Sequence, residues 1–225
     1  MPMEMSPLII SLKTASLATV ITFFAGLYAA HRIVKQKRFK GLIDGLFTLP
    51  MVLPPTVVGF FLLLVFGKNS AIGRFLALFD VSVVFSWAAT VISAVVVSFP
   101  MMYRTTRGAF EQLDMNLIYA ARTLGLSETR IFWAVILPNS WPGVMAGAIL
   151  AFARALGEFG ATIMIAGNIP GKTQTVSTAI YLAVQAGNRE LAYQWVAVAV
   201  LISFAVIMLM NYWTNRQGGA VPRFY

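Results

Sequence analysis

Long uncharged stretches alternate with short charged ones along this chain. Four uncharged runs of 17 to 23 residues lie at 14–30, 46–66, 81–103 and 191–213. A helix of this length can cross the hydrocarbon core of a bilayer. A fifth apolar stretch carries two charged residues. The pattern predicts an all-α integral membrane protein with about five spans, at 8–33, 46–66, 81–103, 141–166 and 191–213.

Composition supports a membrane protein. Of the 225 residues, 59% are hydrophobic and 11% are charged, a balance that ordinary soluble domains do not have. The net charge of +9 fits basic residues that collect in cytoplasmic loops and against lipid head groups, so we expect membrane lipid and no nucleic acid as a partner. The chain has no Cys and a single His31, so we expect no metal site and no cofactor.

Basic residues are unevenly distributed between the predicted loops. With the N-terminus outside and the C-terminus in the cytoplasm, 11 Lys and Arg residues lie in cytoplasmic segments and 4 in external ones. This excess follows the positive-inside rule. No internal repeat or linker interrupts the chain, so we expect one transmembrane domain over residues 1–225 in a plasma or inner membrane.

Three prolines lie in the first half of the predicted span 46–66, namely Pro50, Pro54 and Pro55. Proline should kink or interrupt the helix, and freed carbonyl groups are tolerated at membrane depth only against protein or a water-filled cavity. Pro54 and Pro55 are therefore candidate residues of a translocation pathway. Kinks that only help the helices to pack are an equally good interpretation.

Arg154 and Glu158 are the only charged residues that the pattern predicts at membrane depth. Four residues apart on a helix, they share a face and can form an ion pair. Charges are costly in lipid and normally face the protein interior. We expect the pair either to line a pathway or to neutralise itself and hold helices together.

The stretch 167–186 is too short and too polar to span. Its uncharged part, 173–186, has 14 residues and predicts a re-entrant segment or an external surface helix. Gly171-Lys172-Thr173 has the letters that end a phosphate-binding loop. However, the first glycine of that motif is one residue too close, and no strand precedes it. We therefore expect no nucleotide site in this chain.

The segment 111–138 is a polar island between the third and fourth spans. Apolar residues at helical spacing predict a short helix from Asp114 to Leu124, and Gly125 can adopt the left-handed backbone that turns the chain. A second short helix, capped by Ser127, should follow and end near Pro138. On these residues alone, a helix that lies on the membrane surface without a partner explains the segment equally well.

The island also resembles the cytoplasmic loop of ABC importer permeases, whose signature is Glu-Ala-Ala, then Gly, then Ile-x-Leu-Pro. The residues that match at the family's spacing are Ala120, Ala121, Gly125, Leu137 and Pro138. Tyr119 and Val135 replace the usual Glu and Ile. The resemblance implies a coupling helix in a cleft of an ATPase subunit. It implies that Gly125 makes the turn, that Ala120 and Ala121 make close contact, and that Arg122 and Arg130 pair with the ATPase.

Further segments, at 49–59, 153–162 and 167–175, resemble the molybdate permeases of bacterial ABC importers, and the sulfate and tungstate permeases share a weaker form. The resemblance implies the type I ABC importer permease fold. It also implies a homodimer, two copies of a separate ATPase, an extracytoplasmic molybdate-binding protein and alternating access. The expected function is that of a permease subunit which moves molybdate into the cytoplasm, with sulfate or tungstate as the alternative substrate.

Two other classes of protein remain as alternatives. An intramembrane enzyme would need an acid and a base, but the candidates Glu158 and His31 fall at membrane depth and in a cytoplasmic loop, too far apart for one active site. A passive channel would need no coupling loop. We therefore expect a transport subunit without catalytic residues, whose ATP hydrolysis is carried by another chain.

Overall fold

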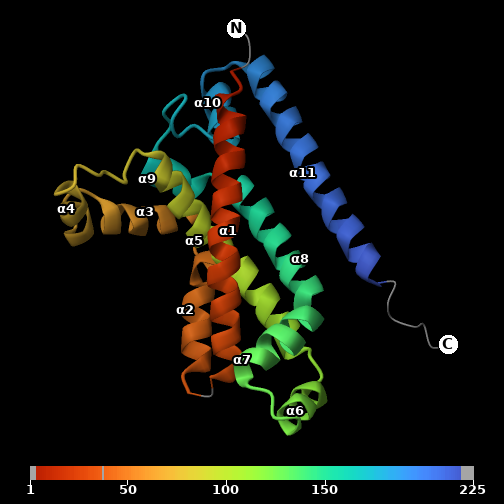
Figure 1. The fold of residues 1–225 in the computed structure, drawn as a ribbon. Helices are drawn as coiled ribbons and strands as arrows, with labels where there is room; N and C mark the ends of the chain where they lie inside the picture. Colours follow the sequence, from red (N-terminus) through yellow and green to blue (C-terminus); the bar gives the residue numbers. More distant parts are fainter. Residues whose placement is uncertain (1–3, 37, 219–225) are drawn as a thin grey trace.

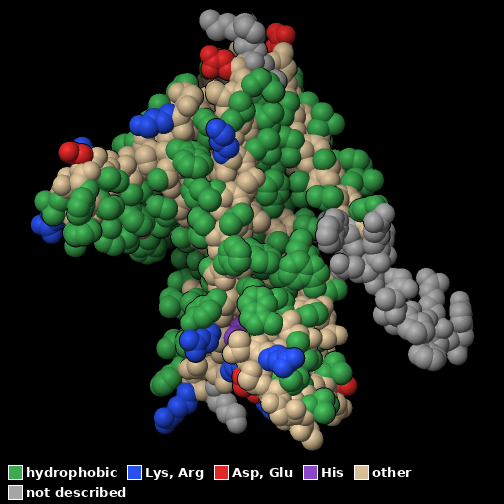
Figure 2. Space-filling model, in the orientation of Figure 1, with side chains coloured by type: hydrophobic (Ala, Val, Ile, Leu, Met, Phe, Trp, Pro, Cys, Tyr) green, Lys and Arg blue, Asp and Glu red, His purple; other side chains and the backbone are tan. Residues whose placement is uncertain are grey.

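The computed structural model describes residues 4–36 and 38–218. Every regular element in this part of the chain is a helix (Figure 1). Four helices are long and apolar enough to cross a membrane, or five if one sharply bent pair counts as a span. On the visible face, hydrophobic side chains cover the middle of the molecule and charged ones lie mostly toward its ends (Figure 2), as expected for a protein surrounded by lipid.

Three long helices form the core. They are α1 (Ser6–Lys35), α5 (Trp87–Glu111) and α8 (Leu137–Leu156). α5 packs against both of the others. Buried alanines, among them Ala15, Ala94 and Ala155, bring the three helices close together, because small residues let helices approach where lipid provides no hydrophobic driving force. The buried Thr14 and Thr90 hydroxyls also lie 3.0 Å apart across α1 and α5.

The predicted interruption at the prolines is confirmed. α2 (Lys40–Val52) and α3 (Pro55–Phe66) are bent by 110° at the break between them. Leu53 and Pro54 are extended, with ψ of 143° and 133°, because a residue that precedes proline is pushed out of the helical region. Pro55 is the first residue of α3. At that position a backbone N–H would have no acceptor within the helix, so proline is tolerated. A small helix, α4 (Ala71–Ala77), follows on the arm that projects sideways (Figure 1).

The third predicted span, 81–103, corresponds to α5, whose bounds differ from the prediction. α5 begins at Trp87 and continues to Glu111. Residues 81–86 form an irregular segment in which Phe85 has a φ of 60° and donates its N–H to the carbonyl of Ile165, at 3.1 Å. At the other end, the helix continues past Tyr103 because Phe110 packs into the core and Arg and Glu are good helix formers.

The prediction that a second short helix ends near Pro138 was wrong. α7 (Glu128–Ile131) continues through a π-helical turn, η1 (Phe132–Ile136), directly into α8. The turn accommodates Pro138: the Leu137 N–H bonds to the Phe132 carbonyl five residues back, and Asn139 Nδ2 donates to the Val135 carbonyl at 2.7 Å. A widened turn and a side-chain donor thus satisfy groups that proline would otherwise disturb.

The predicted helix 141–166 is also two helices rather than one. α8 ends at Leu156, and α9 (Gly160–Ala166) begins after a short break. α10 (Val176–Gln185) is a short helix near the start of α1, with the Val176 N–H donated to Ser11 Oγ at 2.8 Å. The last helix, α11 (Arg189–Gly218), contacts α10 and α8 and diverges from the rest of the molecule (Figure 1).

Candidate functional site: a polar loop and a junction of broken helices

The polar island folds into a helix, a turn and a second helix, as predicted. α6 (Met115–Thr123) is capped by Asp114, whose side chain accepts the Asn116 N–H. Gly125 then has a φ of 75°, a conformation that glycine adopts without steric cost. Ser127 accepts the Arg130 N–H at 3.3 Å and begins α7. The predicted left-handed turn at Gly125 is therefore confirmed.

The six residues singled out in this loop do not all lie at the surface. Four are exposed, namely Ala120, Arg122, Gly125 and Pro138. Ala121 and Leu137 are buried in the chain's own core, in one cluster with Ile131 and Phe110. The expectation that Ala121 forms a contact surface is thus corrected: its side chain is part of the chain's own core, and α6 packs against α7 and the π-helical turn.

Exposed apolar side chains of α6 were not anticipated as a surface. They are Met115, Leu117, Tyr119 and Leu124, which is 80% exposed. The signature drew attention to the small residues between them, although Leu117 and Leu124 were noted only for their helical spacing. Apolar side chains on a polar island, exposed beyond any membrane span, are typical of a protein contact.

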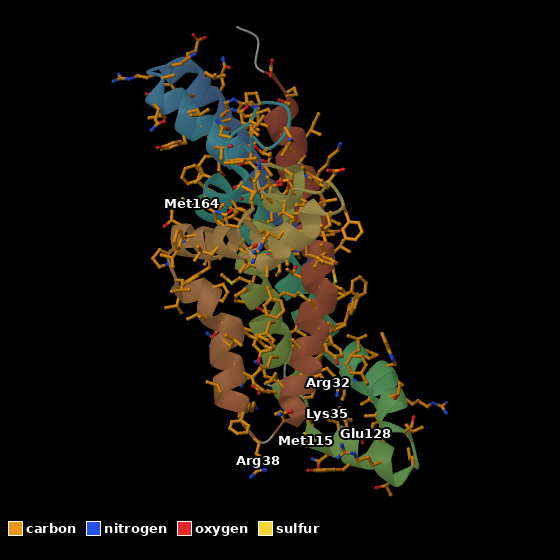
Figure 3. The ribbon with its side chains drawn as sticks, turned by 90° about the vertical axis from the view of Figure 1, so that its left-hand side faces the viewer. Arg32, Lys35, Arg38, Met115, Glu128 and Met164 are labelled. Carbon is orange, nitrogen blue, oxygen red and sulfur yellow. The ribbon has the colours of Figure 1, made fainter. Side chains whose placement is uncertain are left out.

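Arg122 has a partner within the chain. Its Nε lies 2.8 Å from Glu128 Oε1, and Lys35 Nζ of α1 lies 3.3 Å from Glu128 Oε2; Lys35 and Glu128 are neighbours in Figure 3. Glu128 lies in the loop outside the predicted spans. The hydrogen bond from Arg122, followed by that from Lys35, lowers the pKa of Glu128 to about 2. His31 places its ring 4.2 Å from that of Phe132, so the end of α1 contacts the loop at two points.

At the other end of α8, the predicted ion pair is present. Arg154 Nη2 lies 2.8 Å from Glu158 Oε2, although the contact does not have hydrogen-bond geometry. Glu158 is 2% exposed, and its Oε1 accepts the Ala161 N–H at 2.7 Å. The carboxylate therefore caps the first turn of α9, where the helix dipole also favours a negative charge.

Two residues after Glu158, the start of α9 lies against the proline break. A Cβ on Gly160 would lie 2.8 Å from Pro55 Cβ and 3.2 Å from the Thr56 nitrogen, and a Cβ on Gly59 would lie 2.8 Å from the Ala161 Cα. α3 and α9 thus touch at backbone distance near the start of both half-helices. We call this contact the α3–α9 junction. It joins Pro55, at the proline break, to the helix that Glu158 caps, two segments that the sequence pattern did not place together.

The polar island 111–138, which we call the coupling loop after the resemblance described above, is connected to the neighbourhood of the α3–α9 junction by one helix. Residues Glu128–Leu156 form a continuous helical element through the π-helical turn. One end carries the loop and the other carries Arg154, four residues before Glu158. Within residues 4–36 and 38–218, no group of three or more metal-ligating side chains could hold a metal ion.

Comparison with known proteins identifies relatives over nearly the whole chain. The family described as binding-protein-dependent transport system inner membrane component matches residues 22–217. The molybdenum transport system permease protein ModB of Escherichia coli (strain K12) is 39% identical over 215 residues, which is 95% of this chain and 94% of ModB. The sulfate transport system permease protein CysT of Salmonella typhimurium is 35% identical over 214 residues, which is 94% of this chain and 77% of CysT.

Among solved structures, a bacterial alginate ABC transporter in complex with its alginate-bound periplasmic protein has a similar fold. The TM-score is 0.75 at 14% identity, and the match covers 94% of this chain and 78% of the other. The all-α arrangement is the type I ABC importer permease fold, and the protein is a multi-pass membrane protein. This chain belongs to the family of binding-protein-dependent transport system inner membrane components.

Proposed function

We propose that this chain is the permease subunit of an ATP-driven importer that moves molybdate, or a similar tetrahedral oxyanion, into the cytoplasm. The observation that carries the proposal is the continuous helix Glu128–Leu156, which starts in the coupling loop and ends a few residues before α9 and the α3–α9 junction. Similarity to ModB over 95% of the chain supports the substrate class. The chain is a transport subunit, so ATP hydrolysis must come from a separate protein.

The complete importer, in this proposal, contains two copies of this chain, two ATPase subunits in the cytoplasm and an extracytoplasmic binding protein. The alginate transporter solved with its periplasmic protein supports the last of these. On this chain, the ATPase would contact the exposed face of α6, including Ala120, Arg122 and the turn at Gly125. Ala121, Leu137 and Pro138 would hold that face in place and connect it to α8.

The pathway, in this proposal, passes the α3–α9 junction. A tetrahedral oxyanion crossing a low-dielectric region needs a positive potential, but an anion held too strongly would not leave. Arg154 is partly neutralised by Glu158 and keeps 28% of its side chain exposed, whereas Glu158 is enclosed. A charge balanced in this way suits a transient contact with an anion, beside the irregular backbone at Pro54 and Pro55.

Reconstitution tests the function. Liposomes that contain this chain, its ATPase and the binding protein should accumulate molybdate only when ATP is present. Uptake without the ATPase would identify a passive channel, and preferential uptake of sulfate would favour the alternative that CysT represents. Tungstate should compete with molybdate, because the two anions have similar size and charge.

The orientation of the chain is part of the proposal. The excess of basic residues supports an external N-terminus and a cytoplasmic C-terminus. A reporter fused after Lys40 or Arg216 should then signal from the cytoplasm, and one fused after Lys172 should signal from the outside. A cytoplasmic signal from Lys172 would contradict the five-span arrangement.

A further inference from the structure

The two halves of the broken helix are held in very different ways. α3 packs at backbone distance against α9. α2, in contrast, has no buried residue over its whole length, and α5 is the main helix against which it packs. Ile43 and Phe47 pack against the core, but Leu42, Leu46 and Val52 are all at least 65% exposed. α2 is therefore the least firmly packed of the two halves.

The chain changes direction sharply at both ends of α2. At its start, Phe39 has a φ of 58°, a left-handed conformation that marks a sharp change of chain direction. At its end, the chain is extended at Leu53 and Pro54 and turns by 110° into α3. A helix between two such points can rotate as a unit, because few φ and ψ angles need to change.

A group of polar contacts holds α2 on α5. Asp44 accepts hydrogen bonds from Tyr103 Oη, at 2.9 Å, and from the Arg107 guanidinium. Glu111 accepts from Arg107 Nε and from Lys40 Nζ, each at 2.9 Å. The Phe47 ring also packs edge-on against Phe99 and Tyr103, with centroids 5.4 and 5.3 Å away. These contacts are concentrated in the first eight residues of α2, on the side away from the proline break.

The exposure of these groups indicates contacts that can be broken. The Arg107 and Asp44 side chains are 20% and 29% exposed, so water reaches both charges. A fully buried ion pair resists separation because each partner would be left unpaired in a low-dielectric medium. A pair at this depth gains from a charge-assisted hydrogen bond yet can be rehydrated when it opens.

We infer that Asp44, Tyr103 and Arg107 form a latch that fixes α2 on α5, and that α2 swings away from α5 about the Pro54 break during the transport cycle. The inference rests on the proposed pathway at Pro54, because movement of α2 would open or close that pathway from its cytoplasmic side. α3 stays in place as the fixed half. Asp44 and Arg107 thus act on the pathway only through the position of α2, as positioning residues.

Spin-label distances test the latch. The chain has no Cys, so labels can be placed at Leu46→Cys on α2 and at Phe24→Cys on α1, both exposed positions. In the chain reconstituted alone, Asp44→Asn should raise the population of longer distances about tenfold, the factor expected for one lost charged hydrogen bond. A label pair at Phe60→Cys on α3 and Phe24→Cys should not change. Asp80→Asn, the same chemical change in the external arm, is the matched control.

Two further measurements distinguish movement from general loosening. The double variant Asp44→Arg with Arg107→Asp should restore the short distance that each single change disturbs. In the complex with its ATPase, trapping the ATP-bound state should lengthen the α2 distance and leave the α3 distance unchanged. Unchanged α2 distances in Asp44→Asn, or equal movement of α2 and α3, would overturn the latch. Because the first measurement needs neither ATP nor an oxyanion, a failure of the proposed transport function would be recognised separately.

Discussion

The coupling loop and the α3–α9 junction both depend on glycine, but for opposite reasons. Gly125 has a φ of 75° and no neighbour within 4 Å of the position of a Cβ. Gly59 and Gly160 have ordinary helical backbones, and a Cβ on either would meet backbone or Cβ atoms within 2.8 Å. The charges differ in the same way: Arg122 and Glu128 are about half-exposed, whereas Glu158 is 2% exposed.

The contrast shows that glycine serves backbone conformation in the loop and close packing at the junction. The loop depends on backbone shape and leaves its surface free for another protein. The junction depends on the absence of side chains and on a buried carboxylate that caps α9 and is paired with Arg154. Substitutions should therefore act through strain and lost coupling in the loop, and through lost packing and unpaired charge at the junction.

The largest effect is expected at the ion pair of the junction. Arg154→Ala leaves the Glu158 carboxylate buried without a cation, which costs on the order of 3 kcal/mol, and it should abolish uptake. Arg154→Met with Glu158→Gln removes both charges while roughly keeping volume, so it should recover thermal stability. Uptake measured in liposomes then decides the role. A stable double variant with normal uptake would make the pair a packing device rather than part of the pathway.

Close packing at the junction should give the next largest effect. Gly59→Ala places a methyl group 2.8 Å from the Ala161 Cα and carbonyl oxygen, and overpacking of this kind costs about 1 to 3 kcal/mol. The matched control is Gly108→Ala in α5, where nothing lies within 4 Å. Because glycine weakens a helix interior, that change should be neutral or stabilising by up to about 1 kcal/mol. Thermal unfolding in detergent measures both; equal effects would contradict the proposed close contact.

Backbone strain in the loop should have a smaller effect on stability and a specific effect on function. Gly125→Val forces a β-branched residue into the left-handed region, at a cost of about 1 to 2 kcal/mol. The variant should insert normally but lose uptake and substrate-stimulated ATP hydrolysis. Gly187→Val provides the control, since Gly187 has a φ of 71° and equally open surroundings outside the loop. If both variants lost coupling alike, strain in general rather than the shape of this loop would be responsible.

The loop was largely predictable because its signals are local. Asp114 and Ser127 cap helices by contacts two or three residues away, and Gly125 turns the chain through its own backbone. The spacing of Arg154 and Glu158 likewise sufficed to predict their pairing, and the prolines sufficed to predict the interruption near Pro54. In each case the physical cause lies within a few residues of sequence.

The junction could not be predicted, because its causes lie in tertiary structure. The contact of Gly160 with Pro55 requires knowing which helices are neighbours. Around Gly157 the only charged residues are Arg154 and Glu158, and their spacing fits one continuous helix as well as a helix that ends between them. The continuation of α7 into α8 was missed for a related reason. Pro138 normally ends a helix, but the π-helical turn and the Asn139 side chain compensate for it.

The smallest effect is expected at the exposed ion pairs of the loop. Glu128→Gln removes the charge that Arg122 and Lys35 share. Exposed pairs contribute less than about 1 kcal/mol and are screened by salt. Stimulated ATP hydrolysis should therefore fall by less than about fivefold, and the difference from the unsubstituted chain should shrink at about 1 M salt. Glu190→Gln, at the start of α11, is the control for loss of one acidic charge.

The pH dependence of the Glu128 ion pairs gives a further test of the difference between the loop and the junction. The pKa of Glu128 is lowered to about 2 by the hydrogen bonds from Arg122 and Lys35. A carboxylate with a depressed pKa stabilises the folded state above its unfolded pKa, and that contribution is lost as the pH falls toward the folded value. Between about pH 4 and pH 8 the carboxylate stays ionised, so the ratio of activities between the unsubstituted chain and Glu128→Gln should stay nearly constant. A ratio that moves toward one as the pH falls from about 5 to about 4 would mean that Glu128 titrates near its ordinary value, and that the loop is not held by this ion pair.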